Sequence, residues 1–257
     1  MLRRVRTQAN PRHRRRAAAT ALALVTALAL SAPSAAHAVT VYAAASLSGA
    51  FPRIDRSPTY NFAGSNQLQL QIARGAPADV FASASPDEPR ALFRAGRCTR
   101  PVTFATNVLV MITPRANRAR LRSAFDLRRG RHRLAIGSAG VPIGAYTRQV
   151  LSRMGLSSIL RTNTVSQEPN VSGVVSKVAL GSADAGFAYI TDWRAARSRL
   201  GLVRLPARFQ PPVRYQLCAV RRARADTAAA RVFIERVRSR RGRQILRSFG
   251  FGLPPRG

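Results

Sequence analysis

Short apolar runs alternate with amphipathic segments from residue 39 to the end of the chain. The apolar runs have the length of strands, and the segments between them repeat apolar residues at helical spacing. This regular alternation favours an α/β architecture with mainly parallel sheets. The predicted strands are 39–43, 61–63, 79–82, 106–113, 133–136, 162–165, 185–190, 203–205 and 214–220, and the predicted helices are 47–54, 66–74, 86–95, 145–154, 171–180, 227–239 and 242–249.

Two junctions between a predicted strand and the following helix share one design. Ser46 follows the run Val-Tyr-Ala-Ala-Ala, and Ser65 follows Phe-Ala-Gly. Serine is favoured where a helix begins, and the first backbone N–H groups there are unpaired and lie at the positive end of the helix dipole. A hydroxyl donor at such a place predicts an anion site. Each serine taken alone is also consistent with a simple helix cap.

A third junction is rich in glycine. Residues 137–144 read Gly-Ser-Ala-Gly-Val-Pro-Ile-Gly, but they lack the Lys and Ser/Thr of a nucleotide-binding P-loop. A tight connection without a ligand explains this loop equally well. Because ligands of open α/β sheets lie beyond the carboxyl ends of the strands, we expect a ligand near these turns of small residues.

Residues 1–38 have the pattern of a secretory signal peptide. Seven arginines and no acidic residue precede an apolar run at 17–30, and Ala36-His37-Ala38 is a small-x-small cleavage signal. The apolar run is too short to span a bilayer comfortably, so we expect cleavage before Val39 rather than an uncleaved anchor. The location is then periplasmic. No cysteine follows the run, so we expect no lipid anchor on a cysteine.

A strong positive charge raises the question of a nucleic-acid partner. The net charge is +33, and removal of the seven leader arginines leaves +26 on 219 residues. The bases are spread over the chain, and all are arginine except Lys177, which is consistent with a compositional bias. Export also separates the protein from DNA. We therefore expect a field that attracts anions rather than nucleic-acid binding, and a secreted polyanion binder is the remote alternative.

Catalytic constellations are missing from the sequence. Two of the three histidines lie in the leader, and the third, His132, lies in an arginine-rich loop. No cysteine pair has zinc spacing, and the chain lacks the Gly-x-Ser-x-Gly elbow that a serine hydrolase would need. We interpret the scattered acids Asp79, Asp184 and Asp192 as caps or ion-pair partners. The chain is therefore predicted to bind a ligand rather than to be an enzyme, with no cofactor and no directly coordinated metal cation.

The chain has two cysteines, Cys98 and Cys218. An isolated pair in an exported protein predicts a disulfide, because free thiols seldom persist in an oxidising compartment. Two buried free thiols are the alternative.

Several segments together resemble one family. They are Val-Tyr-Ala-Ala-Ala-Ser-Leu (41–47), Phe-Ala-Gly-Ser-Asn-Gln-Leu (62–68), Gly-Ala-Pro-Ala-Asp-Val-Phe-Ala-Ser-Ala (75–84), Tyr-Ile-Thr-Asp (189–192) and the C-terminal segment 229–250. In this order and spacing they resemble the periplasmic molybdate-binding proteins of ABC importers over nearly all of 39–252. The chain departs from that family in its shorter stretch between Ser46 and Phe62, in Ile143, which replaces a smaller residue, and in its high positive charge.

The resemblance implies a type II periplasmic-binding-protein fold. Such a fold has two α/β lobes, each a mainly parallel sheet flanked by helices, and a hinge of two crossovers. Lobe 1 would comprise 39–106 and 213–257, and lobe 2 would comprise 107–212.

The resemblance also implies a site for a tetrahedral oxyanion in the cleft between the lobes. Ser46 and Ser65 would each give a hydroxyl and a backbone N–H, Ile143 and Val171 would each give a backbone N–H, and Tyr189 would give its phenol O–H. The implied function is that of a monomeric receptor that captures molybdate or tungstate and delivers it to the permease of an ABC transporter. A receptor for sulfate or another tetrahedral oxyanion is the alternative.

Overall fold

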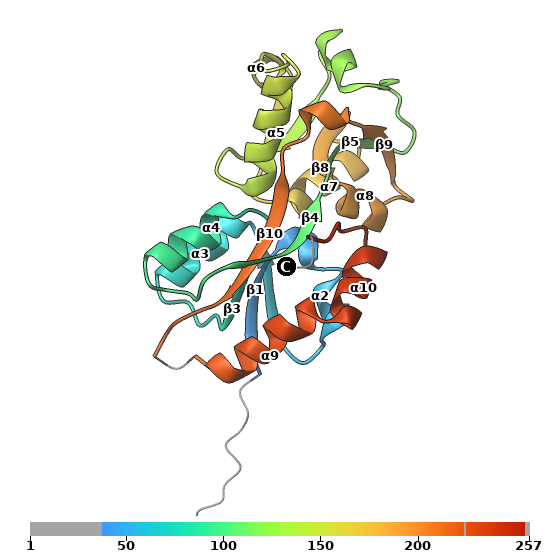
Figure 1. The fold of residues 1–257 in the computed structure, drawn as a ribbon. Helices are drawn as coiled ribbons and strands as arrows, with labels where there is room; N and C mark the ends of the chain where they lie inside the picture. The colour runs from blue at the N-terminus through green and yellow to red at the C-terminus, as the bar shows by residue number, and fades with distance from the viewer. Residues whose placement is uncertain (1–37, 224, 255–257) are drawn as a thin grey trace, which may run out of the picture. The chain divides into compact units, whose positions relative to one another are not determined.

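The computed structural model describes residues 38–223 and 225–254. The predicted leader, Ala38 apart, and its cleavage lie outside these residues. No helix in the described part of the chain is long and apolar enough to cross a membrane. The described residues form two five-stranded sheets, each covered by helices (Figure 1).

The sheet of lobe 1 has the strand order β2-β1-β3-β10-β4. Strand β1 is parallel to β2 and β3, and β10 is antiparallel to β3 and β4, so four of the five strands run in one direction. Helices α3 and α4 cover one face, and α2, α9 and α10 lie on the other (Figure 1). The elements are β1 Thr40–Ala44, α2 Phe51–Ile54, β2 Thr59–Ala63, α3 Ser65–Ala73, β3 Val80–Ser83, α4 Asp87–Arg94, β4 Val102–Asn107, β10 Val213–Ala219, α9 Thr227–Arg238 and α10 Arg240–Ser248.

The sheet of lobe 2 repeats this plan in the order β7-β6-β8-β5-β9. Strand β5 is its antiparallel member, and helix α5 packs on one face while α7 and α8 pack on the other. The α/β fold with two lobes and mainly parallel sheets is therefore confirmed. The elements are β5 Leu109–Pro114, β6 Leu134–Gly137, α5 Pro142–Arg153, α6 Ile159–Thr162, β7 Thr164–Glu168, α7 Val171–Ala179, β8 Ala185–Tyr189, α8 Ile190–Ala195 and β9 Leu200–Arg204, with short 3₁₀ turns η1 Ala45–Leu47, η2 Ala124–Arg128 and η3 Ala207–Phe209.

Strand β1 shows why the sheet forms. Val41 and Ala43 face one apolar cluster, and Tyr42 between them faces a second cluster beneath α3 and α4. All three are buried. A parallel strand covered on both faces needs apolar residues at successive positions, which is the pattern of this run.

The structure corrects several predicted boundaries. The apolar run predicted as one strand, 106–113, is two strands in different sheets, because β4 ends at Asn107 and β5 begins at Leu109. Val108 between them is 48% exposed, so the chain leaves one core before it enters the other. The predicted helix 47–54 is likewise two pieces, η1 and α2, and α5 begins three residues earlier than predicted.

The two chain crossings between the sheets are tied together by one side chain. The Leu109 N–H donates to Gln210 Oε1 at 3.0 Å, and Gln210 Nε2 donates to the Leu109 carbonyl at 2.8 Å. Leu109 follows the first crossing, and Gln210 lies in the second, between β9 and β10. The two crossings are therefore hydrogen-bonded to each other between the lobes.

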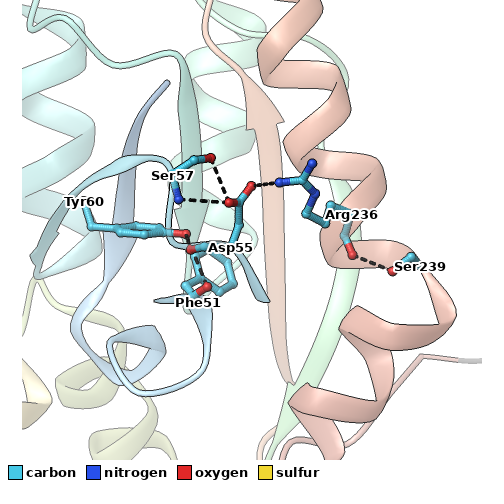
Figure 2. Close-up of polar contacts among 6 residues, drawn as sticks. All are labelled: Phe51, Asp55, Ser57, Tyr60, Arg236 and Ser239. Carbon is cyan, nitrogen blue, oxygen red and sulfur yellow. Dashed lines mark hydrogen bonds and ion pairs between the residues drawn. The ribbon is translucent and has the colours of Figure 1, made fainter. Parts of the chain in front are cut away.

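The short stretch between Ser46 and Phe62 is held by a compact polar cluster (Figure 2). Tyr60 Oη donates to the carbonyls of Phe51 and Asp55 at 3.2 and 2.7 Å. The Asp55 carboxylate accepts from Ser57 and pairs with Arg236 of α9. Burial alone would raise the pKa of Asp55, but these donors lower it below its usual value. The shortened segment is thereby fixed to α9, on the side of the sheet away from α3.

Cys98 and Cys218 are free thiols in the structure, not the predicted bridge. Both are buried in the apolar cluster beneath α3 and α4. They lie on adjacent chain segments, because Cys98 pairs with Val220 and the Thr99 N–H donates to the Ala219 carbonyl at 2.8 Å. The neighbouring Cys98 thiol and burial raise the pKa of Cys218. The two thiols are therefore neighbours in the core of lobe 1, and the disulfide stays a prediction.

We expect the exported protein to contain a Cys98–Cys218 disulfide. Reduction should then lower the free energy of unfolding by about 2–5 kcal/mol, because the bridge closes a long loop in the unfolded chain. Mass analysis after alkylation without reductant measures the thiols directly, and denaturant unfolding with and without reductant measures the stability. The double variant Cys98→Ala/Cys218→Ala is the control and should not respond to reductant. Two alkylatable thiols in the native exported protein would show that the prediction is wrong.

Candidate functional site

A small pocket lies between the two sheets, and all five predicted site residues line it. Ser46 and Ser65 come from lobe 1, and Ile143, Val171 and Tyr189 come from lobe 2. Most of the remaining lining is small, including Ala44, Ala45, Ala63 and Ala84. The cavity volume is about 20 Å³, compared with roughly 10–15 Å³ needed for one water on the same measure. Only a compact group fits a space of this size.

Ser65 is the first residue of α3 and follows the N-cap residue Gly64. Its side chain is buried, and its Oγ accepts a hydrogen bond from the Ala84 N–H at 3.1 Å. That N–H is a donor only, so the hydroxyl hydrogen of Ser65 remains available to an acceptor in the pocket.

Ser46 occupies a different local structure from the one predicted. It lies in the 3₁₀ turn η1 rather than at the start of a continuous helix. The run of small residues ends β1, and the turn carries the Ser46 side chain to the pocket. Its Oγ lies 2.8 Å from Tyr215 Oη.

Ile143 and Val171 line the pocket at the starts of two helices. Val171 is the first residue of α7, and its neighbour Asn170 caps the helix by accepting from the Gly173 N–H at 3.1 Å. Ile143 is the second residue of α5 and follows Pro142, which has no N–H. Backbone N–H groups at these positions have no partner within the helix. Two helix N-termini of lobe 2 therefore direct donors and the positive ends of their dipoles toward the pocket.

Tyr189 ends β8 and is the N-cap residue of α8. Its backbone N–H donates to the Asp192 carboxylate at 3.0 Å, which holds the residue at this junction. The phenol oxygen is buried and has no hydrogen-bond partner within residues 38–223 and 225–254. Burial raises the pKa of Tyr189 well above its usual value, so the phenol keeps its proton. An unpaired buried hydroxyl is costly, which indicates that a bound acceptor completes this site.

No charged side chain lines the pocket, as far as the described residues show. The three acids that the sequence analysis interpreted as caps or ion-pair partners serve those roles. Asp79 pairs with Arg222 at 2.6 Å, Asp184 pairs with Arg133 at 2.8 Å, and Asp192 accepts at the start of α8. The site is therefore a set of neutral donors without a general base.

The lobes touch at the mouth of the pocket. A Cβ atom added to Gly64 of lobe 1 would lie 2.4 Å from the carbonyl oxygen of Pro169 in lobe 2. Across the same cleft, a Cβ on Gly140 would lie 3.5 Å from Asn66 Nδ2, which is an ordinary contact. Gly64 therefore permits a close approach of two backbones that a larger residue would prevent.

Several further residues of the site were not predicted from the sequence. Asn170 carries a signal that could have identified it, since Asn directly before a helix is a common cap. Gly64 precedes Ser65 at the helix start, but nothing local indicates its contact with lobe 2. Tyr215 contacts Ser46 from 169 residues away, and no local pattern reports such a contact.

Comparison with known proteins gives the family. Residues 39–252 match the family model of bacterial extracellular solute-binding proteins. The molybdate-binding protein ModA of Mycobacterium tuberculosis is 34% identical over 85% of this chain and 86% of its own length. Among solved structures, the periplasmic molybdate-binding protein of Azotobacter vinelandii has a TM-score of 0.74 at 24% identity, with 84% of this chain and all of that chain covered. The sulfate-binding protein SubI of M. tuberculosis has a TM-score of 0.69 at 16% identity, with 83% and 85% covered.

The last two likenesses show the fold alone, because their identities are low. The family match and the mycobacterial relative confirm the resemblance drawn from the sequence, and a solute-binding family agrees with the prediction of a receptor rather than an enzyme. The chain thus belongs to the family of bacterial extracellular solute-binding proteins.

Proposed function

We propose that this protein is an extracytoplasmic receptor for molybdate or tungstate, which it captures between its lobes and delivers to the permease of an ABC transporter. The observation that carries the proposal is the convergence of neutral hydrogen-bond donors from both lobes on one small pocket. The name of the 34% identical mycobacterial relative supports molybdate as the ligand. Export by a cleaved leader, a monomeric state and the absence of a cofactor belong to the same proposal.

The donor set would hold a dianion without any countercharge in contact with it. The hydroxyls of Ser46, Ser65 and Tyr189 and the N–H groups of Ile143 and Val171 offer hydrogen bonds to its oxygens. Hydrogen bonds to a charged acceptor are shorter and about twice as strong as neutral ones. The dipoles of α5 and α7 add a favourable field from lobe 2. The overall positive charge would speed capture from a distance rather than hold the bound ion.

A set of donors also discriminates between oxyanions. Molybdate, tungstate and sulfate carry no proton near neutral pH, so each of their oxygens accepts hydrogen bonds. Hydrogen phosphate carries a proton that needs an acceptor, whereas the five proposed ligand groups act as donors. An unpaired buried donor costs roughly 1–3 kcal/mol. The site should therefore reject phosphate, while cavity size decides between molybdate and sulfate.

A thermal-shift panel of oxyanions tests the choice of ligand. Molybdate and tungstate should raise the melting temperature of residues 39–257, and phosphate should not. A thousandfold excess of ligand over Kd stabilises the folded state by about 4 kcal/mol. Sulfate belongs in the panel because a larger shift with sulfate than with molybdate would support the sulfate receptor instead. Equal shifts from phosphate and molybdate would contradict discrimination by donors.

Substitution of two donor side chains tests the site. Ser46→Ala and Tyr189→Phe each remove one hydroxyl donor to a charged acceptor, at a cost of about 1.5–3 kcal/mol, or roughly a tenfold to hundredfold loss of molybdate affinity. Calorimetric titration measures this loss. Ser48→Ala, an exposed serine two residues from Ser46, is the matched control and should bind like the parent. Parental affinity in both donor variants would place the site elsewhere.

Gly64→Ala tests whether binding requires the lobes to meet as they do in the structure. The new methyl group would clash with the Pro169 carbonyl across the cleft, so we expect at least a tenfold loss of molybdate affinity with little change in the melting temperature of the free protein. The control is Gly140→Ala, which faces the same cleft with room for a methyl group. Equal affinities of the two variants would show that this contact does not govern binding.

A further inference from the structure

A chain of buried polar side chains lies behind Ser46 and leads away from the pocket. Ser46 Oγ is 2.8 Å from Tyr215 Oη, and Tyr215 Oη is 3.3 Å from Asn107 Nδ2. Asn107 Nδ2 is also 3.0 Å from Thr191 Oγ1. Asn107 is the last residue of β4, directly before the chain crosses to lobe 2, and Thr191 lies in α8 of lobe 2. Asn107, Thr191 and Tyr215 are all buried.

The orientation of the Asn107 amide follows from its backbone neighbour. The Val108 N–H, which can only donate, lies 2.9 Å from Asn107 Oδ1. The atom it contacts must therefore be the amide oxygen, and the other atom is the NH₂ group. The two hydrogens of that group are then directed to Thr191 and to Tyr215. Tyr215 Oη consequently accepts a hydrogen bond from Asn107.

The remaining hydrogen bond of Tyr215 then has a fixed direction. Its hydroxyl hydrogen needs an acceptor, and within the described part of the chain the only acceptor in reach is Ser46 Oγ. The reverse direction would leave the Tyr215 hydrogen unpaired in a buried place, at a substantial cost. Tyr215 therefore donates to Ser46. One lone pair of Ser46 Oγ is occupied, and the serine hydrogen is left to face the pocket.

The Tyr215 side chain is held in place by packing, which keeps its hydroxyl in position beside Ser46. Its ring makes edge-to-face contacts with Tyr189, Phe251 and Phe104, at centroid separations of 5.9, 5.4 and 6.2 Å. Its side chain is fully buried in β10. Burial also raises the pKa of Tyr215 well above its usual value, so the hydroxyl keeps the proton that it donates.

We infer that Asn107 and Tyr215 are positioning residues that fix the Ser46 hydroxyl as a donor and thereby set the preference of the pocket for oxyanions without a proton. This inference rests on the proposed function. Ser65 has a similar arrangement without an intermediate side chain, since the Ala84 N–H donates directly to its hydroxyl oxygen. In both serines of lobe 1 one lone pair is thus occupied, and the hydroxyl hydrogen is left to donate to a ligand. We call this chain of hydrogen bonds from Asn107 through Tyr215 to Ser46 the relay. Without the relay, the Ser46 hydroxyl could rotate and accept a hydrogen bond from hydrogen phosphate.

Tyr215→Phe removes the donor to Ser46 and leaves the ring contacts in place. We expect molybdate affinity to fall about tenfold and phosphate affinity to stay unchanged or to rise, so that the ratio of molybdate to phosphate affinity narrows by tenfold or more. A loss of packing alone would weaken both anions together and leave the ratio unchanged. Calorimetric or competition titrations with sodium molybdate and sodium phosphate at pH 8 measure the ratio. Tyr60→Phe is the matched control, because it removes another bonded tyrosine hydroxyl of lobe 1 outside the pocket.

A double-mutant cycle with Ser46→Ala tests whether Tyr215 acts on molybdate affinity through the Ser46 hydroxyl. In the Ser46→Ala background no serine hydroxyl remains to be oriented, so adding Tyr215→Phe should change molybdate affinity less than twofold. Asn107→Ala, which removes the group that orders Tyr215, should narrow the molybdate-to-phosphate ratio in the same direction. This second variant tests the relay independently if Tyr215→Phe does not fold.

The outcomes separate this inference from the proposed function. A parent protein that fails to bind molybdate or tungstate contradicts the proposed function. The relay alone is overturned if the parent binds molybdate but Tyr215→Phe leaves the ratio of molybdate to phosphate affinity unchanged. It is also overturned if the losses of molybdate affinity in the double-mutant cycle are fully additive. Three results together support the relay. The ratio of molybdate to phosphate affinity narrows in Tyr215→Phe and in Asn107→Ala, the losses in the double-mutant cycle are not additive, and Tyr60→Phe binds both anions like the parent.

Discussion

The pocket between the lobes depends on one constraint: several hydrogen-bond donors must point into it, and no charged side chain among the described residues lines it. The chain meets this constraint at two serines by placing a donor behind each hydroxyl oxygen, which occupies one lone pair and leaves the hydroxyl hydrogen free. Ala84 does so for Ser65, and Tyr215 does so for Ser46. At Tyr189 the phenol is kept protonated by burial and is left without a partner. Donors fixed in advance lose little entropy when an acceptor arrives, so the orientation of these groups is part of the fold.

The two sheets provide the frame for these donors. In each sheet one antiparallel strand, β10 in lobe 1 and β5 in lobe 2, lies next to a chain crossing. Gln210 ties the two crossings together, and Asn107 contacts both lobes at the same level. The residues that order Ser46 are therefore also residues of the hinge.

The large positive charge of the chain and its neutral pocket have separate roles. Charged groups act over a range of several ångströms to about 10 Å in physiological salt, so an anion is attracted before it reaches the cleft. In the proposed function, contact would then be made by uncharged groups, which can be buried at a lower cost in desolvation than arginine side chains. A charged residue in the pocket would bind many anions, whereas oriented neutral donors distinguish them by protonation.

The sequence by itself determined the alternation of strands and helices, the α/β class and the small-residue turns at which Ser46, Ser65 and Ile143 lie. It did so because periodicity, capping and glycine content are local properties of consecutive residues. The tertiary structure alone decided that the apolar run 106–113 divides between two sheets, that Gly64 meets Pro169, and that Asn107 and Tyr215 order Ser46. These contacts join residues about 100 or more positions apart, and no local pattern of apolar and polar residues encodes which distant backbone or hydroxyl a side chain will meet.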